Sequence, residues 1–513
     1  MFNILKGKIF GKNNKEHIRS LHNIQLKKSL RDNIAIFKEI FMNDGTILFR
    51  NFETKAPDSI KCCLIFADGM VEKEIVNENV LLPIMRHSIP DHIDRSEILD
   101  FLINRIVVSG EVEKTADVDE LVGSILYGDT IVLLDGVKEA LIIDTKGWEF
   151  RTVTEPLSES VVRGPREGFT ESIRVNLSLV RRKIRNSSLK FQFRALGSRT
   201  KTRICLCYLE GVANQKILAE LEERLDKIDI DGILETGYIE ELIKDAPLSP
   251  FRTIGNTERP DVVAGKLLEG RIAVMCDGTP FVLTLPYVFI EHFQASEDYY
   301  TNYMYASLNR FFRLAGFFLS TSVPAIYTAL VTFHKEMIPT PLLLSITAAR
   351  EGVPFPTVVE ALLMLFVFEI IREAGVRLPS AIGQTVSIVG ALVLGEAAVA
   401  AKFVSAPMVI VAALTGIAAF LVPKMFGPLV SIRIVFLLLS AFLGLYGYIF
   451  GVIGLFIHLM SIRSFGIPYM LNVGSLNKQD LKDTAIRAPW WYMYYRPKLI
   501  GDRNPVRKGD AER

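Results

Sequence analysis

Three glutamates inside strongly apolar stretches are the residues of this chain best placed to do chemistry: Glu360, Glu369 and Glu396. A carboxylate is costly in a lipid bilayer, so an acid there commonly lines an ion path or pairs with a cation. Glu360 and Glu369 are nine positions apart (369 − 360), on opposite sides of a helix, so they cannot both line one path. Glu369 precedes Arg372 by three residues and predicts a local ion pair, whereas Glu360 has no close partner in sequence and stays a weaker pore or interface candidate.

Glu396 shares a predicted helical face with Thr385, Val389 and Leu392, because the successive spacings are four, three and four residues. On this face the apolar Val389 and Leu392 would form a gate that closes by excluding water. Glu396 would then form a ring of negative charge in an oligomer, and the face would line a cation path. Gln384 is a further polar residue of the same apolar run.

A structural explanation of Glu396 is equally open. The carboxylate would pair with Lys402 or Lys424 near a membrane interface. Nearby small residues would then only allow helices to pack closely. They are Gly383, Gly390 and Gly395.

The elements that must position these residues are membrane helices. Between Asp298 and Asp480 the chain contains no aspartate, and several apolar runs approach the roughly 20 residues that a bilayer span needs. Pro324 interrupts the first run, which is tolerated when neighbours satisfy the freed carbonyl. The runs predict an all-α polytopic membrane domain of five or six helices over residues 299–470. The candidate spans are Leu314–Phe333, Thr357–Ile371, Ser380–Ala401, Met408–Val422 and Ile434–Met460.

The last apolar run, Val430–Met460, would be roughly 46 Å long as one helix, too long for one upright span and too short for two. Four glycines spaced by three, four and three residues favour a single tilted helix that packs closely on a neighbour. They are Gly444, Gly447, Gly451 and Gly454. The alternative is a glycine-rich turn between two half-spans.

Basic residues next to the spans suggest the topology. Most of them fit cytosolic loops, namely Arg310, Arg313, Arg372, Arg377, Lys424 and Arg433, whereas Lys335 and Lys402 fall on the other side. Five spans would nevertheless put the basic, aromatic tail, residues 471–513, outside. Either the last run folds back, or Leu342–Ala349 inserts, or the tail lies outside; we favour a cytosolic tail. Its Trp490–Tyr495 segment indicates an interfacial aromatic anchor, with subunit docking as the alternative.

The soluble part, in front of the spans, predicts an α/β fold built from two similar tandem subdomains, residues 31–155 and 156–298. Cys63–Gly69 resembles Cys205–Gly211 (205 − 63 = 142), and Gly128–Gly136 resembles Gly270–Gly278 at the same offset (270 − 128 = 142). The repeated Asp-Gly pairs predict type I′ hairpins, although common strand and hairpin chemistry could produce such matches by coincidence. Strands are expected at Cys62–Phe66 and Ile131–Leu134, and a helix at Asn214–Lys227.

The net charge and the positions of the cysteines indicate which kinds of partner the chain is expected to bind. A net charge of +2 argues against nucleic-acid binding, while the basic tail of residues 1–30 would rest on anionic lipid or serve as a solubilising arm. No apolar signal segment follows the first lysines, which predicts a cytosolic N-terminal region. All five cysteines fall in β-like runs and are expected to be buried reduced thiols rather than metal ligands.

A basic hinge, Arg163–Gly168, separates the two subdomains and leads into a predicted helix. This helix would dock an anion or an acidic partner, or present an ordinary solvated face. Its basic residues are Arg174, Arg181, Arg182, Lys183 and Arg185. We find no phosphate-binding loop, nucleophile elbow or metalloprotease motif, so we expect no enzyme, cofactor or metal site.

Several motifs together carry a resemblance to a known family. Glu258-Arg259-Pro260-Asp261, Lys266–Arg271 and the segment that starts at Asp277-Gly278 resemble the A subunit of the GerA family of spore germination receptors. The resemblance continues through Glu297–Tyr300 and the glycine-rich span, and covers roughly residues 150–470 well. It implies a receptor subunit in the spore inner membrane, with its N-terminal domain on the cytosolic (spore core) side.

The resemblance also implies partners. These are a transporter-like B subunit that binds the germinant, a lipoprotein C subunit and further copies of this chain, which would form a homo-oligomer that conducts ions. A secondary transporter with helices broken by proline, and a membrane scaffold that relays ligand binding, are the competing functions.

Overall fold

The structure consists of two compact units. In the computed structural model, the first unit comprises the described parts of residues 1–244, 254–286 and 494–513, and the helical unit comprises those of 245–253 and 287–493. The residues that the structure describes are 24–55, 59–88, 95, 97–147, 156, 159, 161–377, 393–471, 483–484, 486–497, 499–501 and 506–507.

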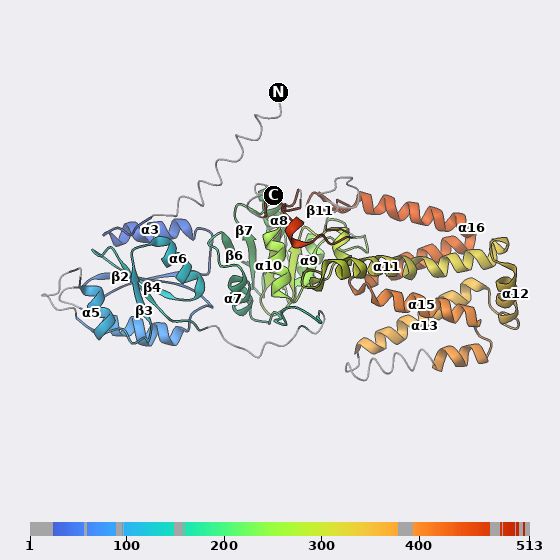
Figure 1. Cartoon of the computed structure of the whole chain (residues 1–513), viewed down its shortest axis with the longest axis horizontal. Coiled ribbons are helices and arrows are strands. Elements are labelled where there is room, and N and C mark those ends of the chain that lie inside the picture. Colours follow the sequence, from blue (N-terminus) through green and yellow to red (C-terminus); the bar gives the residue numbers. More distant parts are fainter. Residues whose placement is uncertain are drawn as a thin grey trace, which may run out of the picture. The chain divides into compact units, whose positions relative to one another are not determined.

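Subdomain 1 of the first unit is a five-stranded antiparallel sheet with helices on both faces (Figure 1). The strand order is β1-β2-β4-β5-β3. The strands are β1 (Ile47–Glu53), β2 (Lys61–Ala67), β3 (Val112–Thr115), β4 (Thr130–Leu134) and β5 (Ala140–Ile143). The helices are α3 (Leu30–Ile40), the π-helix η1 (Ile75–Leu81), α4 (Leu82–Arg86), α5 (Ile98–Arg105) and α6 (Val118–Tyr127).

Alternation along β2 explains the two apolar layers. Cys63 and Ile65 face α3 and α6, whereas Cys62 and Leu64 face η1, α4 and α5. Successive side chains of a strand point to opposite faces, so a strand covered on both faces is apolar throughout. This is why the sequence shows a continuous apolar run here instead of an alternating pattern.

Subdomain 2 repeats this architecture, with strand order β6-β7-β9-β10-β8. Helices α7 and α10 cover one face of its sheet. The strands are β6 (Leu189–Leu196), β7 (Thr202–Leu209), β8 (Gly255–Thr257), β9 (Ile272–Cys276) and β10 (Val282–Leu285). The helices are α7 (Ile173–Lys183), α8 (Gln215–Asp226), α9 (Thr236–Ile243) and α10 (Pro260–Leu268).

The strand register confirms the internal repeat. Cys63 pairs with Leu133 in subdomain 1, and Cys205 pairs with Met275 in subdomain 2, so both partners shift by 142 residues (205 − 63 and 275 − 133). The predicted strands at Cys62–Phe66 and Ile131–Leu134 are present, and α8 begins after the N-cap Asn214. The fold class predicted from the sequence is therefore confirmed.

The repeated aspartates fasten the first helix of each subdomain. The carboxylate of Asp135 accepts from the backbone N–H of Leu30 at 3.0 Å, and that of Asp277 accepts from Ile173 at 3.0 Å. The hairpins exist, but the predicted type I′ turn is wrong, because only the glycine of each pair has a positive φ. Each aspartate instead satisfies a free donor at a helix start.

A buried ion pair joins the two subdomains. Arg181 of α7 donates from Nη2 to Asp44 at 2.6 Å and to the hydroxyl of Thr46 at 2.9 Å, and both charged side chains are buried. The guanidinium also lies over the ring of Phe191. The basic helix is thus not simply a solvated face, since its central arginine already binds an acid of the same chain.

All five cysteines are described and carry free, buried thiols, as the sequence predicts. Burial raises the pKa of Cys62 to about 12 and that of Cys63 to about 11. Because the thiolate is the reactive form, these thiols are unreactive at neutral pH.

The helical unit contains apolar helices of 10 to 36 residues. They are α11 (Tyr303–Thr332), α12 (Thr340–Ala349), α13 (Thr357–Arg377), α15 (Ala406–Phe420) and α16 (Phe426–Ser461). Among the described residues, two segments are long and apolar enough to cross a membrane, Tyr303–Thr332 and Pro423–Ser461. Most of the predicted span Ser380–Ala401 lies outside the described residues, so the predicted number of spans stays a prediction.

The prediction of one continuous helix over Val430–Met460 is wrong, because a glycine turn divides this run into two helices. Gly444 breaks α16 with φ 60° and ψ −142°, a conformation that is essentially restricted to glycine. The chain then folds back (Figure 1), so that Gly451 packs against Phe436 and Tyr448 packs against the same ring. The glycines allow the two halves of a helical hairpin to approach each other.

Short elements flank the helices of this unit. Before α11 lie two 3₁₀ turns, η2 (Phe289–Phe293) and η3 (Ser296–Tyr299). After α16 come the strands β11 (Arg463–Ser464) and β12 (Ile467–Pro468), and later the turn η7 (Trp490–Tyr492). We call these elements, together with residues 245–253, the neck of the helical unit.

Candidate functional site

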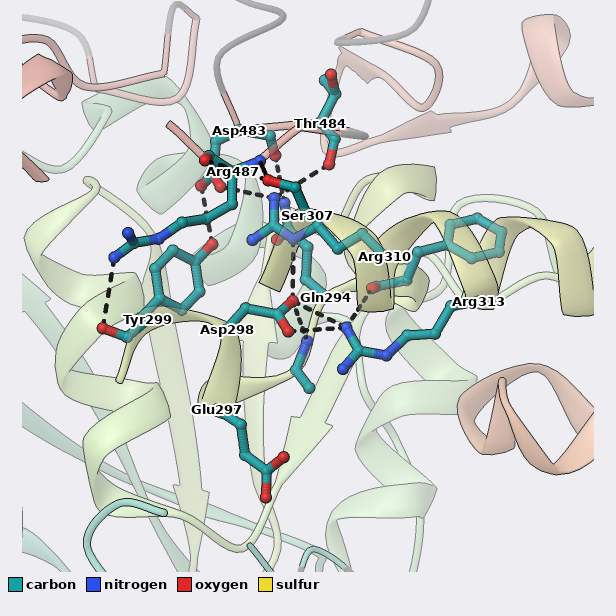
Figure 2. A network of polar contacts seen from close by, with 12 residues as sticks. Gln294, Glu297, Asp298, Tyr299, Ser307, Arg310, Arg313, Asp483, Thr484 and Arg487 are labelled. Carbon is teal, nitrogen blue, oxygen red and sulfur yellow. Dashed lines mark hydrogen bonds and ion pairs between the residues drawn. The ribbon is translucent and has the colours of Figure 1, made fainter. Parts of the chain in front are cut away.

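The neck holds a buried network of charged side chains at the start of α11 (Figure 2). Asp298 is at its centre and accepts from Arg310 Nε at 2.9 Å and from Arg313 Nη1 at 2.8 Å. Asp298 and Arg310 are 1% and 0% exposed. Two arginines on successive turns of α11 therefore share one carboxylate.

A second carboxylate reaches this network from the C-terminal part of the chain. Asp483 accepts from Arg310 Nη1 at 2.8 Å and from the Tyr299 hydroxyl at 2.8 Å. The carbonyl of Thr484 accepts from the same guanidinium nitrogen at 3.0 Å, and the backbone N–H of Arg487 donates to Ser307 of α11. Arg310 and Arg313 face the two carboxylates, the buried Arg487 adds a third positive charge beside Tyr299, and the network ties the C-terminal segment to the first long helix (Figure 2).

An aromatic cluster in the neck surrounds a buried histidine. His292 and the Tyr469 hydroxyl share a hydrogen bond of 2.8 Å, and Tyr287 meets the imidazole edge-on. Burial lowers the pKa of His292 to about 3, although Glu291 acts in the opposite direction; Lys424 and Arg252 add to the lowering. The neck therefore keeps His292 neutral.

Acidification is expected to destabilise the neck through His292. The folded state keeps this imidazole neutral down to about pH 3, whereas the unfolded chain takes up a proton near pH 6.5. Between pH 6.5 and pH 5 the unfolded state gains about 2 kcal/mol from this group. Thermal unfolding in detergent should show a fall in the melting temperature of the wild type over this range, and the fall should be smaller in His292→Asn. The exposed His87 provides the control variant His87→Asn, and equal slopes for all three proteins would contradict the assignment.

A third group of polar contacts lies where α11 contains Pro324. Proline has no backbone N–H, so the carbonyl of Ser320, four residues earlier, loses its helical donor. Arg433 of α16 donates to this carbonyl from Nε at 2.9 Å and to the Ser320 hydroxyl from Nη2 at 3.0 Å. The expectation that a neighbour satisfies the freed carbonyl is confirmed.

Arg433 also binds Glu369 of α13 at 3.3 Å, and Glu369 forms its predicted ion pair with Arg372. The local pair is confirmed, but the sequence did not reveal that Glu369 joins α13 to α16. The sequence predicts Arg310 and Arg433 in cytosolic loops, whereas both side chains are buried in contacts with other elements. Their basic character is therefore weak evidence for the side of the membrane.

Glu360 is fully buried, and its partners come from other elements instead of its own helix. It accepts from the backbone N–H of Ser405 at 2.9 Å and from the Ser405 hydroxyl at 2.7 Å, and it pairs with Arg350 at 3.2 Å. Ser405 is the N-cap of α15, where a negative charge is favourable. Glu360 thus holds the start of one apolar helix against another.

Glu396 differs from the two other glutamates. It lies in the helical residues 393–400 and is exposed, and it forms no hydrogen bond or ion pair with another residue that the structure describes. The alternative of an ion pair with Lys402 or Lys424 is therefore not observed. The other residues of the predicted face, Thr385, Val389 and Leu392, and the nearby Gln384, lie outside the described residues.

The motif Glu258-Arg259-Pro260-Asp261 fastens the linker between the subdomains. Arg259 is buried and donates to Asp261 at 2.9 Å and to the carbonyl of Pro165 at 2.8 Å. Pro260 is the first residue of α10, a position that does not need a backbone N–H. With Asp277 and Gly278 at the β9–β10 hairpin, these motif residues have structural roles in the first unit.

Sequence reasoning missed Asp298 and Asp483 because the network joins residues that are far apart in the chain. The available signal was the pair Arg310 and Arg313, which lie one turn apart at the start of an apolar helix. Two arginines at such a place need acidic partners unless they reach water.

This chain is similar in sequence to known proteins. The family model described as "Bacillus/Clostridium GerA spore germination protein" matches residues 35–499. Spore germination protein KA of Bacillus subtilis (strain 168) is 44% identical over 96% of this chain and 90% of its own length. GerLA of Bacillus cereus is 40% identical over 93% of this chain and 95% of its own length. The B. subtilis protein YfkQ, named an uncharacterized membrane protein, is 42% identical over 92% of this chain and 91% of its own length.

One solved structure is also similar. It is the N-terminal domain of the A subunit of the Bacillus megaterium spore germinant receptor GerK3, with 36% sequence identity and a TM-score of 0.42. The match covers 52% of this chain and 98% of that domain.

Proposed function

Because this chain belongs to the GerA family and is an A subunit of a spore germination receptor, we propose that it is the oligomeric subunit that conducts ions and transduces the signal. Opening of its ion path would release cations from the spore and trigger germination. The chain would reside in the spore inner membrane, with the first unit on the cytosolic (spore core) side. Its partners would be a transporter-like B subunit, which binds the germinant, and a lipoprotein C subunit.

The observation that supports an ion path is the difference between the three glutamates. Glu360 and Glu369 are neutralised by arginines, whereas Glu396 is exposed on an apolar helix and has no partner among the described residues of one copy. A carboxylate in contact with lipid would be unfavourable. Glu396 is therefore expected to face water or a second copy of the chain, as a residue of a pore between copies would.

Two other functions compete with this proposal. A secondary transporter would need a helix broken at Pro324, and a scaffold is favoured by the many contacts between the neck and α11. The helix α11 continues through Pro324, and Arg433 binds the carbonyl of Ser320 that Pro324 frees, which leaves that carbonyl unavailable to a substrate ion.

Cation efflux from liposomes that contain the purified protein tests the proposal. We expect Leu392→Ala to raise resting potassium efflux about tenfold or more, because alanine lacks three carbon groups of leucine, each worth about 0.8 kcal/mol if buried in a closed gate. Glu396→Gln should lower cation passage in the Leu392→Ala background without lowering the amount of folded protein.

The matched control for Glu396→Gln is Glu351→Gln, which changes an exposed acid outside the apolar runs. Equal resting efflux in Leu392→Ala and wild type, with equal protein in the membrane, would remove this helix face from the ion path. Efflux that requires a specific small-molecule substrate would favour the transporter. Loss of folded Glu396→Gln protein would favour a structural role for this carboxylate.

A further inference from the structure

The internal repeat allows each position of subdomain 2 to be compared with its equivalent in subdomain 1, and one pair of positions differs. In subdomain 1 the segment after β5 turns back and forms an antiparallel bridge between Lys146 and Val71. The backbone N–H of Glu72 donates to the carbonyl of Thr145 at 2.9 Å, and that of Gly147 donates to Met70 at 3.2 Å. In subdomain 1, the residues that follow β5 thus pair with the residues that follow β2.

The equivalent position in subdomain 2 is closed by residues from far along the chain. Val71 corresponds to Ala213 (71 + 142 = 213), and Lys146 corresponds to Val288 (146 + 142 = 288). Ala213 forms its antiparallel bridge with Gly501, not with Val288. We call this position, residues 212–214 and 268–270, the closing slot.

The route of the chain explains why Gly501 takes the place of Val288. After β10 the chain enters the neck, where Tyr287 donates from its backbone N–H to the Ser464 hydroxyl and Phe289 donates to the carbonyl of Tyr469. The residues that should fill the closing slot are therefore used by the helical unit. The slot receives Leu499–Gly501 in their place.

The segment in the slot buries one side chain, and it makes hydrogen bonds and close backbone contacts with subdomain 2. Ile500 is 0% exposed, and Arg496 donates from Nε to the carbonyl of Leu268 at 2.7 Å. The side chain of Asn214 donates to the carbonyl of Leu499 at 3.3 Å. A Cβ atom on Gly270 would meet the carbonyl of Val212 at 2.8 Å and the backbone of Gly501 at 2.9 Å, so the segment lies directly on that glycine.

We propose that the closing slot is a binding site for an extended peptide and that its occupant, Leu499–Gly501 of the same chain together with Arg496, is required to complete subdomain 2. Earlier in the C-terminal part of the chain, Asp483, Thr484 and Arg487 bind α11 within the helical unit. This inference does not depend on the proposed function.

Hydrogen exchange of the full-length protein in detergent tests the inference. In Ile500→Asp, we expect amide exchange at residues 212–214 and 268–271 to be about tenfold faster or more, because loss of a buried aliphatic side chain opens the site locally. The equivalent amides at residues 70–72 and 147 of subdomain 1 should be unchanged, which provides a control within the same molecule. Ile500→Val keeps the apolar side chain and should behave like the wild type. Unchanged exchange in Ile500→Asp would overturn the proposal.

An engineered cysteine pair tests whether the segment in the slot comes from the same chain or from a second copy. Ala213→Cys and Gly501→Cys place two thiols opposite each other across an antiparallel bridge, and a Cβ at Gly501 has no contact closer than 3.3 Å. We expect oxidation to give a disulfide within one chain, while the native thiols stay reduced because they are buried. A disulfide-linked dimer would overturn the assignment of the occupant to the same chain, and the absence of any disulfide would overturn the occupation of the slot.

Discussion

The substitution Asp298→Asn is expected to destabilise the folded protein by about 3–5 kcal/mol, the usual effect of removing one partner from a buried ion pair. Asparagine has nearly the same shape as aspartate, so packing is almost unchanged. The effect comes from charge, since Arg310 and Arg313 would be left with Asp483 as the acid bound to this network. The substitution therefore leaves a buried excess of positive charge.

The measurement is the apparent melting temperature in detergent, with protease cleavage of the C-terminal segment as a second readout. Glu297→Gln is the matched control, because its carboxylate is the next one in the chain and points away from the two arginines in Figure 2. The double variant Asp298→Asn with Arg313→Gln restores the charge balance and should recover part of the loss. Equal melting temperatures for Asp298→Asn and Glu297→Gln would mean that the network contributes little to stability.

Gly444→Ala and Gly447→Ala are expected to disrupt the helical hairpin of α16. Alanine at position 444 would have to adopt φ 60° and ψ −142°, which costs about 1–3 kcal/mol. At position 447 the new Cβ would overlap the carbonyl oxygen of Leu439 in the other half of the hairpin. A backbone oxygen cannot move aside as the end of a flexible side chain can, so the two halves must separate.

Gly454→Ala is the control for both hairpin variants. A Cβ at Gly454 has open space around it, and alanine is a better helix former than glycine by roughly 0.5–1 kcal/mol. We therefore expect the melting temperature in detergent to fall in Gly444→Ala and Gly447→Ala and to stay level or rise in Gly454→Ala. The same change in all three variants would contradict the hairpin.

The sequence was sufficient to predict the soluble fold because its signals are local and occur twice. An apolar run followed by an acid and a glycine appears near Cys63 and again near Cys205, and each copy constrains the interpretation of the other. The ion pair of Glu369 with Arg372 was predictable for the same reason, since three residues on a helix bring two side chains together.

Contacts between distant residues could not be predicted in this way. Asp298 and Asp483 are separated by 185 positions (483 − 298), and no periodic pattern relates them. The partners of Glu360, Ser405 and Arg350, belong to other elements, so they cannot be found from the residues next to Glu360 in the sequence. The glycine pattern of α16 failed for a different reason: a spacing argument assumes a continuous helix, and Gly444 has a backbone conformation that breaks it.

The replacement of Val288 by Gly501 in the closing slot also fixes the order in which the parts of subdomain 2 are synthesised. The chain leaves subdomain 2 at Pro286 and supplies its missing piece only at Gly501, so all of the long helices are inserted between two parts of one soluble fold. A ribosome makes these parts in that sequence. The closing slot of subdomain 2 therefore stays empty until every apolar helix has been made. A chain whose synthesis stops before Gly501 exposes residues 212–214 and 268–270 to solvent.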